Sequence, residues 1–430
     1  MNHITIIIDK STFQLLSYPE LLKLSNYYKH NITPILVMEI LGDLKKGVSV
    51  GQLPSDIRVK DFASKLFPMN TIVNAHYEKL VRHDLLNGKV PLDGRPNTGV
   101  EKVVQSETGM KGFLLEETEE EKAIYKWKDG KFAEADHKLS ELWRASTTEE
   151  SLLVKLQSAI KEQNGSLKLK SYSELDTLVT ETLNQPDKQD VFLAKLIDNY
   201  GLFGDTGNKI FNRWLEAGRP LIREFAPYAY HCLRVDMIFL LGLQSHLIGT
   251  RPTNRVDMEY LYYLPFCNVF SSNDKIHKNI TPLLLRKDQH FISGEELKKD
   301  LKMIVEYLET GGDELKRKYN HEPPILPDSL TFRLWKEYFG YPESSNWDRT
   351  TSDKDMEYVK KKMDEFQRAS KGEKIEWENG EEPEFIIKES WLSKNDPCYC
   401  GSGKKVIECC IPEEKFNQMA EKNRGKKPND

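Results

Sequence analysis

The segment that most constrains the fold is the apolar run over residues 3–8, His-Ile-Thr-Ile-Ile-Ile. Its β-branched residues favour a strand, and because polar residues do not alternate along it, both faces of that strand should be buried. Strands of this kind occur in parallel sheets that helices cover on both sides. Residues 268–272, Asn-Val-Phe-Ser-Ser, predict a second buried strand. We therefore predict an α/β fold, built on a parallel sheet flanked by helices.

Several segments around these strands predict helices. The first is residues 18–28. Thr33-Pro34 suits a cap and first turn, and it precedes a largely buried helix that carries Glu39 among aliphatic residues. The apolar and aromatic residues 226–247 predict a core helix, and residues 253–266 predict another helix that ends just before the second strand.

Composition limits the class of protein. A chain of 430 residues with 39% hydrophobic residues has room for two or three globular domains. No apolar run approaches the length of a membrane span, and the first residues lack the features of a signal peptide. We therefore expect a cytoplasmic protein with no membrane partner. The net charge of −5 argues against non-specific coating of nucleic acid, but not against an enzyme with local basic patches.

Four acidic residues have positions that call for a ligand. Asp9 and Asp274 each follow a predicted buried strand, at the edge where open α/β sheets bind ligands. Asp257 lies in the first turn of the helix before the second strand, and Glu39 lies in an otherwise apolar helix. A buried carboxylate is costly without a partner, and one hard divalent cation would serve all four.

Three segments carry these acids: ITIIIDKST (4–12), ITPILVMEILGDL (32–44) and RVDMEYLYYLPFCNVFSSNDK (255–275). Together they resemble the signature blocks of PIN-domain ribonucleases. The resemblance implies that Asp9, Glu39, Asp257 and Asp274 bind magnesium or manganese for phosphodiester hydrolysis, with RNA as the expected substrate. It also implies Ser11 as a nearby polar helper. Lys10 and Lys275 either help to neutralise the phosphate or are ordinary surface lysines.

Alternatives remain open for several of these positions. Glu39 and Asp257 are 218 residues apart, which is much longer than in compact members of the family, so a large insertion must interrupt the domain. Asp236 and Glu259 therefore compete with Asp257 as the third acid, and Asp43 is a candidate additional ligand. Asp9 and Asp257 could also be simple helix caps, and Asp274 could simply close a turn.

The cysteines form a second candidate site. Four of the six fall within residues 398–410, as a C-x-C pair and a C-C pair around a Gly-Ser-Gly-Lys-Lys turn. Four thiolates at this spacing suit a tetrahedral zinc ion, and a redox-active thiol cluster is the alternative. The segment NDPCYCGSGKKVIECC (395–410) resembles the SEC-C motif of many bacterial proteins. The resemblance implies a structural zinc ion bound by Cys398, Cys400, Cys409 and Cys410, in a module that recruits a partner or the substrate.

Cys232 and Cys267 stand alone in apolar surroundings and predict buried thiols.

We accordingly predict a metal-dependent PIN-like nuclease with a zinc-binding module. The competing prediction is a non-catalytic PIN-like/SEC-C adaptor that binds protein or ribosomal partners through its zinc module. The expected segments are a PIN-like domain in two parts (1–95 and 226–290), a helical insertion (96–225), a helical region (291–370), a linker (371–390), the zinc module (391–412) and a disordered tail (413–430).

Overall fold

A computed structural model describes residues 3–47, 53–66, 71–98, 101–105, 111–115, 118–148, 153, 156–158, 167–340, 385–388, 405 and 408. The chain divides into two compact units. Unit 1 comprises residues 1–99 and 120–310, and unit 2 comprises residues 100–119 and 311–430. Among the helices that the structure describes, none combines the length and apolar character that crossing a bilayer requires.

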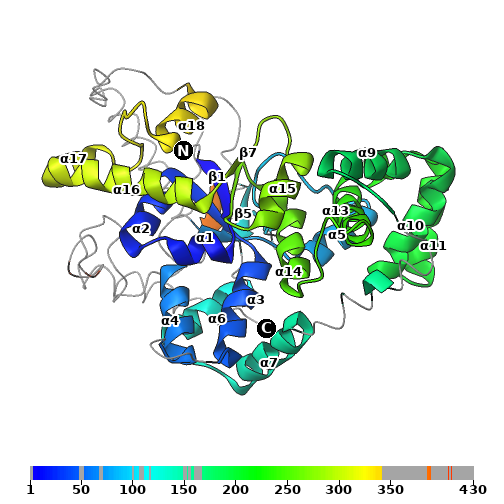
Figure 1. The fold of residues 1–430 in the computed structure, drawn as a ribbon, viewed down its shortest axis with the longest axis horizontal. Helices are drawn as coiled ribbons and strands as arrows, with labels where there is room; N and C mark the ends of the chain where they lie inside the picture. The colour runs from blue at the N-terminus through cyan, green and yellow to red at the C-terminus, as the bar shows by residue number, and fades with distance from the viewer. Residues whose placement is uncertain are drawn as a thin grey trace. The chain divides into compact units, whose positions relative to one another are not determined.

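Unit 1 is an α/β structure with a five-stranded sheet in the order β3-β2-β1-β6-β7. All neighbouring strands are parallel, which confirms the predicted α/β class and parallel sheet. The strands are β1 (Ile4–Ile8), β2 (Tyr28–Ile32), β3 (Thr71–Val73), β6 (Val269–Ser271) and β7 (His290–Ile292). Two distant parts of the chain therefore form one sheet (Figure 1).

β1 is the central strand, and its sequence explains that position. All five residues are buried, and Ile6 and Ile7 have no exposed surface. Ile7 is in register with Phe270 of β6, and Ile6 with His30 of β2. An uninterrupted isoleucine run is stable only where both faces meet apolar side chains, as they do in the middle of a covered sheet.

Helices surround this sheet. In Figure 1, α16 lies beside α1 and α2, with which it is in contact, and α13 contacts α5, α9 and α12. The described helices of this unit are α1 (Lys10–Leu15), α2 (Tyr18–Tyr27), α3 (Pro34–Gly42), η1 (Asp43–Lys45), α4 (Ser55–Lys65), α5 (Tyr77–Leu85), α6 (Glu119–Lys128), α7 (Glu134–Thr148), α9 (Tyr172–Leu183), η2 (Pro186–Lys188), α10 (Gln189–Asn199), α11 (Asp205–Glu216), α12 (Ile222–Phe225), α13 (Pro227–Gln244), α14 (Thr253–Tyr260), η3 (Leu261–Phe266), α15 (Lys275–Leu284) and α16 (Gly294–Thr310). The first residue of α6, Glu119, falls in unit 2.

Local signals explain where several of these helices begin and end. Thr33 caps α3 by accepting a hydrogen bond from the Leu36 N–H, and Pro34 is the first helical residue, as predicted. The single helix expected over residues 253–266 differs from the structure. α14 ends at Tyr260, and a 3-10 helix continues to Phe266 because Pro265 has no N–H for an α-helical bond.

Unit 2 contains a second, three-stranded sheet in the order β4-β5-β8. β4 (Glu101–Gln105) and β5 (Lys111–Leu115) are antiparallel, and β5 is parallel to β8 (Phe385–Lys388). The first two strands lie within the range expected to be a helical insertion, and β8 lies within the expected linker. β5 and β8 pair across about 270 positions in the chain, which no local pattern indicates. Within the described part of this unit, the helices are α17 (Gly312–Lys318) and α18 (Leu330–Phe339).

Candidate metal centre

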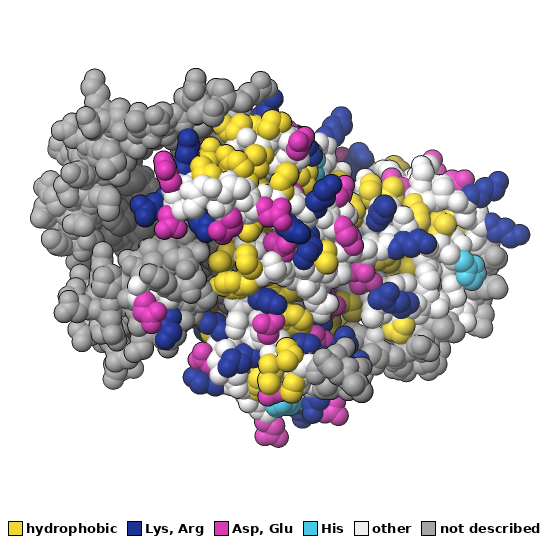
Figure 2. Space-filling view, turned by 60° about the vertical axis from the view of Figure 1, so that its left-hand side comes forward, with side chains coloured by type: hydrophobic (Ala, Val, Ile, Leu, Met, Phe, Trp, Pro, Cys, Tyr) yellow, Lys and Arg dark blue, Asp and Glu magenta, His cyan; other side chains and the backbone are white. Residues whose placement is uncertain are grey.

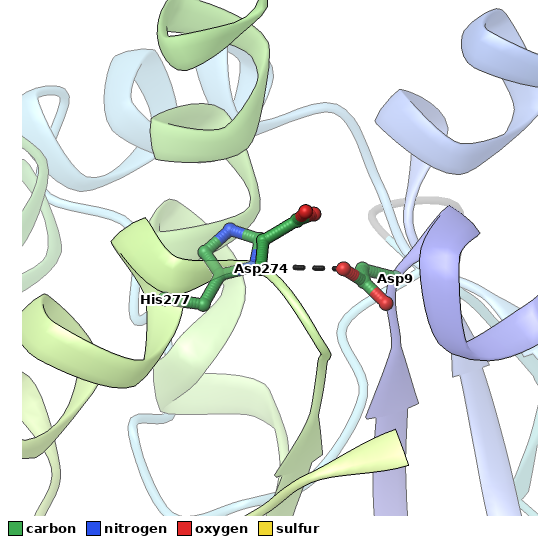
Figure 3. Close-up of side chains that lie close together, drawn as sticks. All are labelled: Asp9, Asp274 and His277. Carbon is green, nitrogen blue, oxygen red and sulfur yellow. Dashed lines mark ion pairs between the residues drawn. The ribbon is translucent and has the colours of Figure 1, made fainter. Parts of the chain in front are cut away.

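The candidate site lies at a switch point of the sheet in unit 1. The chain runs outward from β1 through β2 to β3 on one side and returns through β6 to β7 on the other. Ligands of open α/β sheets bind at such a point, outside the carboxyl ends of the strands. Asp9 follows β1 directly, and Asp274 comes three residues after the end of β6. In Figure 3, Asp9 stands at the end of its strand, and Asp274 and His277 belong to the start of α15.

Asp9 is held firmly and is almost completely buried. Its Oδ1 accepts a hydrogen bond from the Thr12 N–H at 2.8 Å, which caps α1, and its Oδ2 accepts from Ser272 Oγ at 2.6 Å. Ser11, the expected polar helper, also donates to Asp9, at 2.8 Å to Oδ2. Burial raises the pKa of Asp9, but the hydrogen bond and charge of His277, with the other donors, hold that pKa at about 2. Asp9 is therefore an ionised carboxylate.

His277 is a site residue that we did not predict. Its side chain is fully buried, and its Nδ1 lies 3.5 Å from Asp9 Oδ2 (Figure 3). One ligand atom from each of Asp9, Asp274 and His277 falls within 4.8 Å of the others, so the two aspartates lie close enough to share one metal ion. The available signal was the spacing of His277 three residues after Asp274, because residues three apart share a helix face.

The hydrogen bonds around His277 define its charge in this structure. Nε2 lies 2.6 Å from the Asp257 carbonyl oxygen, which can only accept, so Nε2 carries a proton. Nδ1 lies 2.7 Å from Ser272 Oγ, whose own proton goes to Asp9. Nδ1 therefore donates as well, and the ring is an imidazolium. Burial lowers the pKa of His277, but the hydrogen bond and charge of Asp9, together with Asp257, raise it to about 9.

Glu39 approaches the same place from α3. Tyr260 Oη donates a hydrogen bond to Glu39 Oε2 at 2.5 Å, and Lys10 Nζ donates to the Glu39 backbone oxygen at 2.7 Å. Burial raises the pKa of Glu39. Lys10 and Tyr260 act against that rise, whereas the negative charges of Asp9 and Asp274 add to it. Glu39 is thus close enough to both aspartates to interact with their charges.

Asp257 and Asp274 are the least neutralised acids of the site. Asp257 lies just beyond the first turn of α14, is 8% exposed, and receives no hydrogen bond at its carboxylate from the residues that the structure describes. Burial raises the pKa of Asp257 to about 7, and the charges of Asp274 and Glu39 contribute to that rise. Burial and then the charge of Asp9 raise the pKa of Asp274. Asp274 is the N-cap residue of α15, but its side chain makes no capping hydrogen bond.

The four acids suggested by the sequence interact electrostatically with one another. Among the described residues, the group at metal-ligand spacing contains Asp9 and Asp274 with His277, and Glu39 and Asp257 lie outside it. We call Asp9, Glu39, Asp257 and Asp274 the acidic cluster. Among the described side chains, His277 is the cation paired with a carboxylate of the cluster, that of Asp9, and Lys10 binds the Glu39 backbone oxygen. Four carboxylates beside these two positive charges form an oxygen-rich environment, which is what hard divalent cations prefer.

The candidate additional ligand, Asp43, is used elsewhere. Lys10 Nζ lies 3.0 Å from Asp43 Oδ1, and Arg58 Nε lies 3.7 Å from Asp43 Oδ2. Asp43 therefore holds Lys10 against α3, where the ammonium group also binds the Glu39 backbone oxygen. This arrangement gives Lys10 a structural role beside the site.

The two competitors of Asp257 belong to a separate group. Arg255 binds Asp236 Oδ1 at 3.1 Å through Nη1 and Glu259 Oε1 at 3.3 Å through Nε. Tyr262 Oη also donates to Asp236 Oδ1, at 2.6 Å. An arginine that occupies both carboxylates satisfies them without a metal ion.

Two exposed cations lie near the acidic cluster. Lys275 begins α15 next to Asp274. Arg251 precedes α14, and its positive charge lowers the pKa values of Asp257 and Asp274 against the larger effect of burial. We did not predict Arg251, because nothing local in its sequence connects it with the acids.

The predicted zinc ligands, Cys398, Cys400, Cys409 and Cys410, lie outside the described residues. Cys232 and Cys267 are buried free thiols, as predicted. No family model matches the chain, and no solved structure matches it.

Proposed function

We propose that this protein is a divalent-metal-dependent nuclease of the PIN-like type that hydrolyses phosphodiester bonds in RNA. The observation that supports the proposal is the approach of Asp9 and Asp274 at the switch point of a parallel sheet, with Glu39 and Asp257 close enough to interact with their charges. These acids come from four different elements and from both ends of unit 1. Carboxylates that served only as helix caps would not be expected close together, because their like charges repel.

The donor set fits magnesium or manganese. All four acids offer carboxylate oxygens, and the Asp257 carboxylate has no hydrogen-bond donor among the described residues. An unpartnered, nearly buried carboxylate is costly unless a cation accompanies it. Glu39 and Asp274 are half-buried, so part of each side chain reaches the surface.

Each side chain has a definable task in this reaction. A bound divalent ion would polarise the scissile phosphate and lower the pKa of a water molecule that attacks it. Asp9 is oriented for binding by Ser11, Thr12 and Ser272, and its rotamer is therefore fixed before any ligand arrives. His277 compensates the charge of Asp9 and ties Ser272 to the Asp257 backbone.

Substrate binding must rely on a few local cations. On the face drawn in Figure 2, Lys and Arg side chains are interspersed with Asp and Glu over the described surface. Arg251 and Lys275 lie beside the acidic cluster, and both side chains are exposed and make no ion pair or hydrogen bond with the described residues. We assign them to contacts with the phosphate backbone, which bind without reading sequence.

The test is cleavage of a fluorescent single-stranded RNA, and of DNA of the same sequence, with Mn²⁺ or Mg²⁺. The ligand variants are Asp9→Asn and Asp274→Asn. Asp274→Asn is easier to interpret, because Asp274 makes no capping bond, whereas Asp9 also caps α1. Loss of an outer-shell partner costs roughly 10–100-fold, so either ligand variant should lose at least about 100-fold in cleavage rate. Asp187→Asn, an exposed residue far from the cluster in sequence, is the control. Equal cleavage by wild type, Asp9→Asn and Asp274→Asn would refute the assignment of these acids as metal ligands. Absence of any metal-dependent cleavage would favour the non-catalytic adaptor.

The cysteine-rich tail belongs to the same proposal as a zinc-binding SEC-C-like module that recruits the substrate or a protein or ribosomal partner. Its support is the number and spacing of the four cysteines. Zinc content measured on wild type and on a Cys409→Ser, Cys410→Ser variant tests it, with about one equivalent expected only in the wild type.

A further inference from the structure

Tyr260 links two sides of the acidic cluster. It is the last residue of α14, three positions after Asp257, and is 1% exposed. Its hydroxyl donates to Glu39 Oε2 at 2.5 Å, although Glu39 lies 221 residues earlier in the chain. Among the residues that the structure describes, no other side chain donates to the Glu39 carboxylate. Tyr260 therefore controls the orientation of this carboxylate.

The ring of Tyr260 also contacts His277. The two rings meet edge to face, with centroids 5.8 Å apart and planes at 77°. Phe270 contacts His277 in a similar way, at 5.0 Å and 76°. The imidazolium is thus held between two aromatic rings, and the same tyrosine that orients Glu39 supports the residue paired with Asp9.

We propose that Tyr260 is the positioning residue of the metal centre, holding Glu39 through Oε2 so that Oε1 is presented to the cation. The inference rests on the proposed metal-dependent function. Outer-shell donors of this kind fix a ligand before the metal arrives and remove the entropy cost of ordering it. A tyrosine hydroxyl keeps its proton at neutral pH, so Tyr260 Oη can donate this hydrogen bond.

The chain offers a matched control two residues away. Tyr262 is also 1% exposed, and its hydroxyl likewise donates to a carboxylate, Asp236 Oδ1, at 2.6 Å. Tyr260→Phe and Tyr262→Phe remove the same hydroxyl group and keep the same ring. Only the first change affects a member of the acidic cluster.

The experiment is a calorimetric titration of the full-length, zinc-loaded protein with Mn²⁺ alone. We expect Tyr260→Phe to weaken Mn²⁺ binding by roughly 10–100-fold and Tyr262→Phe to leave it within about two-fold, because only Tyr260 supports a ligand. Equal binding by wild type and Tyr260→Phe, or equal loss in both variants, would overturn the positioning role while the metal site stood. A wild type that binds no Mn²⁺ would overturn the proposed function itself.

A second measurement separates positioning from general loosening of the fold. In a Glu39→Gln background the carboxylate that Tyr260 orients is already lost, so adding Tyr260→Phe should cause no further loss of Mn²⁺ affinity. An additive loss in this double variant would show that Tyr260 acts through something other than Glu39. Thermal unfolding of each variant checks that the ring packing against His277 has survived.

Discussion

The acidic cluster should make the metal-free protein less stable than a version with one charge removed. Asp257 is the most informative position, because it is 8% exposed and its carboxylate lacks a donor among the described residues. Replacement by Asn preserves the size of the side chain and removes the charge. We therefore expect Asp257→Asn to stabilise the metal-free protein at pH 8.

The size of this effect follows from the pKa of Asp257, which burial and the neighbouring acids raise from 3.8 to about 7. That is about three pKa units, or about 4 kcal/mol at 1.36 kcal/mol per unit. The pKa of Asp257 is higher in the folded than in the unfolded state. Its contribution to the free energy of unfolding is therefore full below pH 3.8 and is lost as the pH rises through about 7. The free energy of unfolding of Asp257→Asn, relative to wild type, should thus rise by up to about 4 kcal/mol between pH 4 and pH 8.

The assay is urea unfolding with excess chelator at both pH values, followed by circular dichroism. Asp187→Asn serves as the control because Asp187 is exposed. Adding Mn²⁺ at about 100 times its Kd should then stabilise the wild type by about 2.7 kcal/mol and Asp257→Asn by much less. A variant whose stability follows that of the wild type at both pH values would refute the reasoning.

Two further predictions concern other charged residues. Asp84 Oδ2 accepts from the N–H groups of Tyr228 and Ala229 at the start of α13, and burial raises the pKa of Asp84 to about 6. The contribution of Asp84 to stability is lost as the pH rises through about 6. In urea unfolding, the stability of Asp84→Asn relative to wild type should therefore rise by about 3 kcal/mol from pH 3 to pH 8. A stability difference between the two proteins that does not change with pH would contradict this. Arg251→Ala should tighten Mn²⁺ binding about two-fold, by removing one exposed positive charge, and raise KM for RNA in a salt-dependent way. Weaker Mn²⁺ binding by that variant would contradict this account of Arg251.

Two of the five strands of the central sheet could be predicted because their signals are local. The isoleucine run of β1 and the apolar run before Asp274 each predict a strand from no more than six residues. β2 carries no such signal, since Lys29, His30 and Asn31 interrupt its apolar pattern. Asn31 is nevertheless buried, where its side chain donates to the Phe266 backbone oxygen at 2.9 Å. A distant partner makes this polar strand acceptable, and such partners are invisible in a single segment.

The candidate site shows the same division between local and distant information. The four acids could be proposed because Asp9 and Asp274 follow predicted strands, Glu39 lies in an apolar helix, and Asp257 lies near the start of the helix before the second strand. The roles of His277 and Tyr260 depend on contacts with Asp9 and Glu39 across more than 200 residues. Asp236 and Glu259 are likewise explained only by the structure, because the side chain of Arg255 forms ion pairs with both carboxylates.

The pairing of β1 with β6 has a consequence for synthesis of the protein. β1 finds its first neighbour, β2, soon after synthesis, but its second neighbour, β6, is made about 260 residues later, which takes roughly 13–50 s at 5–20 residues per second. During that time Asp9 and Glu39 exist without Asp257 and Asp274. A nascent or prematurely released chain therefore cannot assemble the cluster, and any activity that depends on it begins only when translation has passed the second half of the sheet.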